Sequence, residues 1–251
     1  MTTPVDLPRQ GWGDPSSPRR ALLVHGLGST GALMWRFGVE LSGHGWFAQA
    51  VDLRGHGSAP RTLDYTIGAY ATDLAACHPR DEAPWDLVIG HSLGGTTAVV
   101  AAASAPDWTR RLVLIDPAIQ LDEEDREGVR ESQQRQFDDP TAAAVRAEHP
   151  SWHPLDIELK VRSIHEVSRW AVEQTSEQNQ EWDVRLPALS LDVPIHVIAG
   201  DPAVYALFRG DIVEQLLTRP SITMSVVEGA GHSPHRDAPD ETMRQLWEAL
   251  A

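Results

Sequence analysis

The chain has 251 residues, of which 36 are acidic and 21 basic, giving a formal net charge of −15. An acidic balance of this size argues against nucleic acid and anionic membrane surfaces as partners. The single cysteine, Cys77, excludes an intrachain disulfide, and no stretch approaches the ~18 apolar residues of a membrane span. Residues 1–20 lack the apolar segment of a signal peptide, so we expect a cytoplasmic protein.

Short apolar runs alternate with helical segments along most of the chain. Strands are predicted at residues 20–24, 47–53, 87–90, 111–115, 194–199 and 222–227, and helices at 66–78, 93–105 and 241–250. This alternation predicts an α/β fold with a doubly wound, mostly parallel sheet. Polar motifs follow the predicted strands, and ligands of such sheets bind outside the carboxyl ends of the strands. We therefore expect the functional site at that edge.

Residues 117–191 break the alternation with a charged stretch of helical periodicity. Candidate helices are 123–137, 141–148, 155–172 and a short one near 177–183. We predict that 117–191 is an inserted helical cap over a core formed by 1–116 and 192–251. The cap contains Trp152, Trp170 and Trp182, and large aromatic side chains in an acidic segment favour an apolar contact. We expect them to bind substrate, although some belong to the cap's own core; the alternative is a solvated appendage with no role.

The most informative motif is GHSLG at residues 90–94, directly after the predicted strand 87–90 and before a helical run. In the G-x-S-x-G elbow, a strained strand-to-helix turn exposes the serine hydroxyl, and the glycines let strand and helix pass closely. Ser92 is therefore predicted to be a nucleophile.

A nucleophilic serine needs a base, an acid and an oxyanion hole. His232 follows the last predicted strand in GAGH, where the chain order serine, acid, histidine places the base. The backbone amides of Leu27 and Leu93 are the predicted oxyanion donors, because Leu93 follows the nucleophile and Leu27 lies in the glycine-rich loop after the first strand.

These motifs together resemble those of an α/β-hydrolase of the ester- and lactone-cleaving kind. HGLG at 25–28, DLRGHGS at 52–58, GHSLGG at 90–95 and GAGH at 229–232 agree with the family in order and spacing. The resemblance covers 20–116 and 192–250, with the family's usual cap position between them. It implies a serine esterase or lactonase, and it implies that 52–58 is structural.

The chain departs from the family's commonest form at the acid and at the N-terminus. Ala203 stands where the usual acid would follow the strand 194–199, so the candidates are Asp116, at the end of the preceding strand, and Asp201. We favour Asp116, because some lactonases of the family carry the acid there, and keep Asp201 as the alternative. About 19 residues precede the first clear strand, which predicts a shortened N-terminal edge of the sheet.

The function predicted from the sequence is hydrolysis of a carboxylic ester or lactone of a bulky apolar small molecule, without cofactor or metal. Alternatives are C–C bond or thioester hydrolysis by the same triad, a small-ligand receptor on the same fold, and a dinucleotide oxidoreductase. The last rests on GLGSTG at 26–31, with Asp52 about 20 residues on, but it leaves Ser92 and His232 unexplained. His149 and His153 have a metal-ligand spacing that prolines interrupt. The oligomeric state stays open.

Overall fold

The computed structural model describes residues 3–251, so residues 1 and 2 of the predicted core range lie outside it. In this part of the chain seven strands form one sheet in the order β1-β3-β2-β4-β5-β6-β7. Their bounds are β1 Arg9–Trp12, β2 Arg20–Val24, β3 Phe47–Val51, β4 Leu87–His91, β5 Leu112–Ile115, β6 Ile195–Ala199 and β7 Ile222–Val226. Only β1 pairs antiparallel among these strands, which confirms the predicted mostly parallel sheet.

The strand β1 was missed because its sequence, RQGW, contains no apolar run. Its residues are largely exposed and it pairs with β3 alone, at the edge of the sheet. A strand at the edge of a sheet can stay exposed to solvent, so its sequence need not contain the alternating or continuous apolar residues by which buried strands are recognised. Within residues 3–251 a single strand precedes β2, in agreement with the shortened N-terminal edge.

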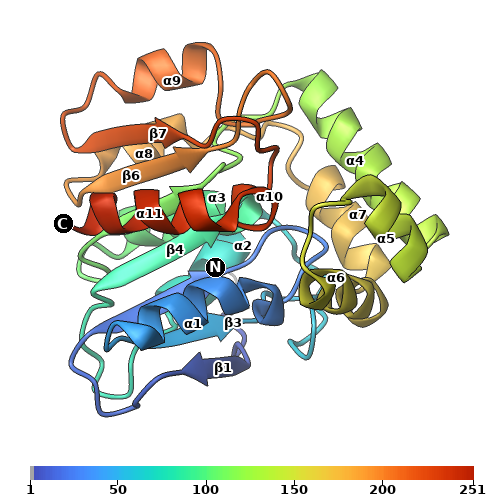
Figure 1. Cartoon of the computed structure of the whole chain (residues 1–251). Helices are drawn as coiled ribbons and strands as arrows, with labels where there is room; N and C mark the ends of the chain where they lie inside the picture. The colour runs from blue at the N-terminus through green and yellow to red at the C-terminus, as the bar shows by residue number, and fades with distance from the viewer. Residues whose placement is uncertain (1–2) are drawn as a thin grey trace.

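Helices cover both faces of the sheet (Figure 1). Their bounds are α1 Trp35–Gly43, α2 Ile67–Ala75, α3 Leu93–Ser104, α4 Glu123–Asp138, α5 Ala142–Glu148, α6 Pro154–Glu166, α7 Arg169–Glu177, α8 Arg185–Ser190, α9 Asp211–Leu216, α10 Pro234–Asp237 and α11 Pro239–Leu250, with a 3₁₀ turn at Gly31–Met34. Alternate residues of β2 face opposite sides, so Leu22 packs with α2 and α3, whereas Leu23 packs with α1 and α11. None of the helices in residues 3–251 is both long and apolar enough to cross a bilayer.

The helices α4 to α7 lie together beyond the carboxyl ends of the strands (Figure 1). This is the place where a cap was predicted. The helix α8 lies instead beside the sheet, where Ala188 is buried in the same apolar cluster as residues of α2 and α3. The segment between β5 and β6 therefore lies over the carboxyl ends of the strands and returns to the core before β6 begins.

Two helix predictions in this segment were wrong. The predicted helix 155–172 is two helices, because Val167 is extended and the amide of Ser168 donates to the Gly55 carbonyl (2.9 Å) of the core. The short helix near 177–183 does not form. Instead, the side chain of Asn179 bonds to the backbone of Tyr65 and Ile67, which holds this stretch against the core. Tertiary hydrogen bonds override local propensity at both places.

Candidate active site

Ser92 occupies the sharp turn between β4 and α3. Its backbone has φ 52° and ψ −119°, a conformation that costs free energy for a residue with a side chain and persists only when its surroundings impose it. A Cβ on Gly90 would lie 2.6 Å from the Gly94 carbonyl oxygen, and a Cβ on Gly94 would collide with the Val24 carbonyl of β2. The glycines are therefore required by close backbone packing, as the elbow motif predicts.

Of the two predicted oxyanion donors, one follows Ser92 in the chain and the other lines the cavity that Ser92 lines. Leu93 is the first residue of α3, so its amide is among those at the helix N-terminus that have no partner within the helix. Leu27 belongs to the loop after β2 and lines the same cavity as Ser92. Backbone amides can stabilise a negative charge that develops next to a nucleophilic serine, and this role stays a prediction for Leu27 and Leu93.

Two buried histidines hold the loop that carries Leu27. His25 Nε2 accepts from the Leu53 amide (3.0 Å), and His56 Nε2 accepts from the Gly28 amide (3.2 Å). Each Nδ1 faces a backbone carbonyl, so the ring hydrogen is on Nδ1. Burial lowers the pKa of His25 to about 4 and the pKa of His56 to about 3, so both rings stay neutral acceptors at pH 7. The 52–58 segment thus has the structural position that the sequence suggested.

Asp116 lies against His232. The distance from His232 Nδ1 to Asp116 Oδ2 is 2.6 Å, and Asp116 is fully buried at the end of β5. The same carboxylate accepts from the amides of Leu207 (2.9 Å), Phe208 (3.2 Å) and Gly200 (3.3 Å). Four donors surround the carboxylate, so its position is fixed and its oxygens serve only as acceptors. This arrangement orients the imidazole with Nε2 free for another partner.

Asp201 lies elsewhere. Its oxygens accept from the amides of Ala203 (2.8 Å) and Gly229 (2.8 Å), and these backbone bonds lower the pKa of Asp201. The carboxylate therefore ties the loop after β6 to the loop after β7, which carries His232. The structure brings Asp116, not Asp201, to the imidazole.

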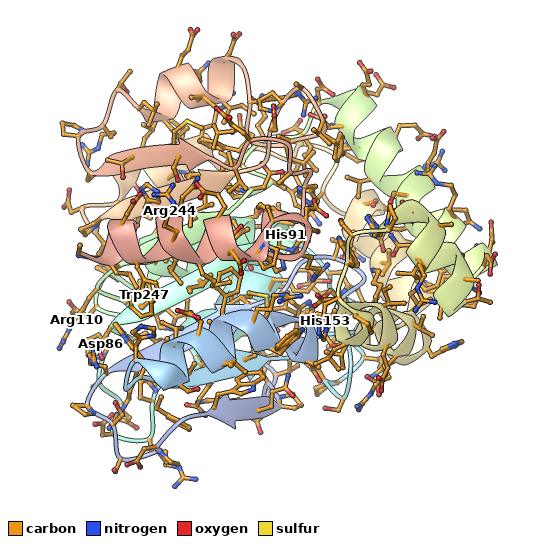
Figure 2. All side chains as sticks on the ribbon, in the orientation of Figure 1. Asp86, His91, Arg110, His153, Arg244 and Trp247 are labelled. Atoms are coloured by element: carbon orange, nitrogen blue, oxygen red, sulfur yellow. The ribbon has the colours of Figure 1, made fainter. Side chains whose placement is uncertain are left out.

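His91, the residue before Ser92, contacts the loop that carries His232. Its Nε2 lies 2.9 Å from the His232 carbonyl oxygen, and its ring packs edge-on to His235 of α10, 4.8 Å away between centroids. Figure 2 shows His91 beside α10, far from the exposed Arg110–Asp86 ion pair near the opposite ends of the strands. Burial holds the pKa of His91 well below its usual range, so the ring is neutral.

A cavity of about 800 Å³ opens above Ser92 and His232. Its lower wall comes from the core loops after β2, β6 and β7, and its upper wall comes from α4, from α6 and from the segment between α5 and α6. Its apolar lining includes Leu27, Val129, Trp152, Val204 and Tyr205. Helices α4 and α6 and the segment between α5 and α6 therefore enclose the cavity together with the core loops.

The three predicted cap tryptophans have different positions. Trp152 lines the cavity and stacks on His149, with 3.8 Å between the ring centroids. Its Nε1 donates to the carboxylate of Asp237 (2.6 Å). Trp182 is buried in the main core, with Nε1 donating to a backbone carbonyl. Trp170 is 43% exposed and packs edge-on against Tyr65. The structure places only Trp152 of these three beside the predicted nucleophile.

Sequence reasoning missed two buried cations in the cavity wall, Lys160 of α6 and Arg236 of α10. Burial, followed by the charge of Arg236, lowers the pKa of Lys160 to about 7, and burial lowers the pKa of Arg236 to about 10. Lys160 lies in a helical apolar pattern and Arg236 four residues after His232. The available signal was therefore only that Arg236 is a basic residue close in sequence to the predicted base His232.

The pKa of Lys160 leads to a prediction about stability. An unfolded lysine has a pKa of about 10.4, so between pH 7 and pH 10 the unfolded chain binds more protons at this position than the folded chain. This residue therefore makes the folded state more stable as pH rises, by at most about 1.4 kcal/mol per pH unit. We expect any stabilisation by Lys160→Met to be largest at pH 7 and to shrink towards pH 10 in urea unfolding. A constant difference between variant and wild type would contradict the low pKa.

The sequence matches the profile of the Alpha/beta hydrolase family over residues 21–245. The chain belongs to this family. It is 28% identical to N-formylmaleamate deformylase of Pseudomonas putida over 222 residues, which cover 84% of this α/β-hydrolase and 81% of the deformylase. It is 39% identical to the lipase LipV of Mycobacterium tuberculosis over 118 residues, but the matched part is 47% of this chain and 44% of the lipase.

Solved structures agree with the fold. The crystal structure of E-2-(acetamidomethylene)succinate hydrolase superposes with a TM-score of 0.82 and 22% identity, and the match covers 100% of this chain and 98% of the other. An esterase from Exiguobacterium antarcticum gives a TM-score of 0.80 at 15% identity over both full chains. At these identities the likeness concerns the fold. The esterases and the lipase among the relatives are consistent with a hydrolase acting on a small molecule.

Proposed function

We propose that this α/β-hydrolase is a serine hydrolase that cleaves carboxylic esters or lactones, with Ser92 as nucleophile, His232 as base and Asp116 as acid. The observation that carries the proposal is the 2.6 Å bond between His232 and the buried Asp116, beside a cavity that His232 shares with Ser92. A histidine oriented in this way can accept the proton of a serine hydroxyl.

The reaction proceeds through an acyl-enzyme. Ser92 Oγ attacks the carbonyl carbon while His232 takes its proton, and the amides of Leu27 and Leu93 stabilise the oxyanion. Collapse of the tetrahedral intermediate expels the alcohol, which takes the proton from His232. Water then attacks the acyl-enzyme with His232 again as base, and a second collapse releases the acid and returns the proton to Ser92. Each step uses groups of this chain and water.

The apolar lining supports an apolar part of the substrate. Trp152, which the sequence led us to expect as a substrate contact, and Leu27 offer flat and aliphatic surfaces to a bulky group in the cavity that His232 also lines. Trp170 and Trp182 lie outside this proposed contact, since one packs on Tyr65 and the other in the core.

Amide hydrolysis is the second candidate. The deformylase relative, which aligns with most of this chain, has a name that denotes removal of a formyl group from an N-formyl compound. The same acyl-enzyme route cleaves such a bond when His232 protonates the departing nitrogen. The rates of hydrolysis of matched esters and amides, measured side by side, decide between the two candidates.

Covalent labelling tests the nucleophile. We expect a fluorophosphonate to add once to the wild type, as measured by intact mass, and the wild type to hydrolyse p-nitrophenyl butyrate. The variant Ser92→Ala should do neither, because no other group in the proposed mechanism can form the acyl-enzyme. Ser151→Ala is the matched control, since Ser151 lines the same cavity and should leave labelling intact. Labelling of Ser92→Ala, or an inert wild type, would refute the proposal and favour a receptor or another chemistry.

A further inference from the structure

Two cations in the cavity wall are buried without a counter-ion. Lys160 is 6% exposed and Arg236 is 4% exposed, and neither makes an ion pair within residues 3–251. Lys160 Nζ donates to the Gly28 carbonyl (2.9 Å), which uses one of its three hydrogens. In the same part of the chain Arg236 Nε and Nη2 have no hydrogen-bond partner, and neither has the buried hydroxyl of Ser29 in the same wall.

The acidic groups near Arg236 are bound to other donors. Asp237 accepts from Trp152 Nε1 (2.6 Å) and the Gly231 amide (2.9 Å). Asp156 accepts from Trp35 and forms an ion pair with Arg36. These carboxylates lower the cost of burying the guanidinium, but they leave its free N–H groups unpaired.

Glu148 is the acidic group that offsets the charge of Lys160. Its side chain is 45% exposed beside His149, so it lies where water screens it. The two cations therefore retain unused donors in a water-poor part of the cavity. Buried charges are normally paired, because an unpaired charge away from water is costly.

Lys160 contacts one of the predicted catalytic loops through a hydrogen bond, and Arg236 follows the other closely in sequence. The carbonyl that Lys160 contacts belongs to Gly28, the residue after the proposed oxyanion donor Leu27. Arg236 is four residues after His232, on α10, and its guanidinium lies 5.0 Å from the ring centre of Trp152. An anion held by both would lie in the same cavity as Ser92, since Lys160, Arg236 and Ser92 all line it.

We propose that Lys160 and Arg236, with the Ser29 hydroxyl, form a carboxylate-binding subsite, and that the substrate carries a free carboxylate a few bonds from the cleaved carbonyl. The inference rests on the proposed serine hydrolase function. A carboxylate matches the fork of donors of a guanidinium, and charge-assisted bonds of this kind are among the strongest hydrogen bonds in proteins. The substrate then combines an acidic end with the apolar group facing Trp152, in place of the wholly apolar molecule expected from the sequence.

Matched substrates test the subsite in the wild type. Monobenzyl succinate carries the carboxylate, and benzyl 4-methylpentanoate replaces it with an isopropyl group of similar shape. We expect kcat/KM, measured from benzyl alcohol release, to be at least tenfold higher for the acidic ester. Equal values, or a preference for the neutral ester, would overturn the proposal.

Variants locate the effect. Arg236→Gln is expected to lower kcat/KM for monobenzyl succinate about 10- to 100-fold while changing the neutral ester less than about threefold. Lys160→Met should act in the same direction. Arg135→Gln is the matched control, because Arg135 also lines the cavity but is exposed, and it should change neither value. Equal losses on both esters in Arg236→Gln would show a structural role and refute the subsite.

Binding of succinate separates this proposal from the catalytic one. By isothermal titration calorimetry the wild type should bind succinate, and Arg236→Gln should bind it at least tenfold more weakly. This result supports the subsite even in a protein whose Ser92 fails to label. A wild type that hydrolyses the neutral ester but shows neither succinate binding nor an acid preference would refute the subsite and leave the serine hydrolase function standing.

Discussion

Replacing Asp116 with asparagine is expected to lower kcat on an ester by 10³- to 10⁴-fold, with little change in KM. The amide group of asparagine cannot accept at both oxygen positions, so the imidazole of His232 loses the 2.6 Å acceptor that keeps its hydrogen on Nδ1. A ring in the other tautomer presents a hydrogen instead of a lone pair to the serine. Steady-state kinetics on p-nitrophenyl butyrate measure the loss of kcat. Complete labelling of the variant by the fluorophosphonate after a long incubation would show that the cavity is intact.

Asp201→Asn is the control for this prediction. It makes the same chemical change in a carboxylate that accepts from Ala203 and Gly229 and lies away from the imidazole. We expect a much smaller loss of kcat, reflecting only a looser loop after β7. A larger loss in Asp201→Asn than in Asp116→Asn would reverse our assignment of the acid.

The second large effect is expected on stability, from the buried ion pair between Arg54 and Asp73. Arg54 Nε and Nη2 donate to the two oxygens of Asp73 at 2.6 and 2.7 Å, and both side chains are almost fully buried. Asp73→Asn would leave the guanidinium without a counter-charge and set an amide NH₂ against its N–H groups. We expect the free energy of unfolding to fall by about 3–5 kcal/mol in urea titrations followed by tryptophan fluorescence.

A double variant and a surface pair make this prediction specific. Arg54→Met with Asp73→Leu should be less destabilised than Asp73→Asn alone, because it removes both buried charges. Glu127→Gln breaks an exposed pair with Arg130, and we expect no measurable change there because water screens that pair. If the exposed and buried variants lose similar stability, the argument from burial is wrong.

The fold could be predicted because its determinants are local in sequence. Buried parallel strands such as β2 and β4 are short apolar runs, and the glycines around Ser92 have a steric reason that their spacing reveals. Elements without such a signal were missed or misjudged. The edge strand β1 has no apolar run, and the break between α6 and α7 depends on a bond from Ser168 to Gly55, over a hundred residues away.

The sequence by itself determined the family, the mostly parallel sheet and the elbow at Ser92, because these follow from the order of residues along the chain. Only the tertiary structure decided which aspartate meets His232. The sequence favoured Asp116 but kept Asp201 as the alternative, because the two follow neighbouring strands and the direction of each carboxylate depends on packing. It alone also separated Trp152 from Trp170 and Trp182 and brought Lys160 and Arg236 into one cavity. Contacts between distant segments depend on packing in three dimensions, and a single sequence does not show which side chains line the same cavity.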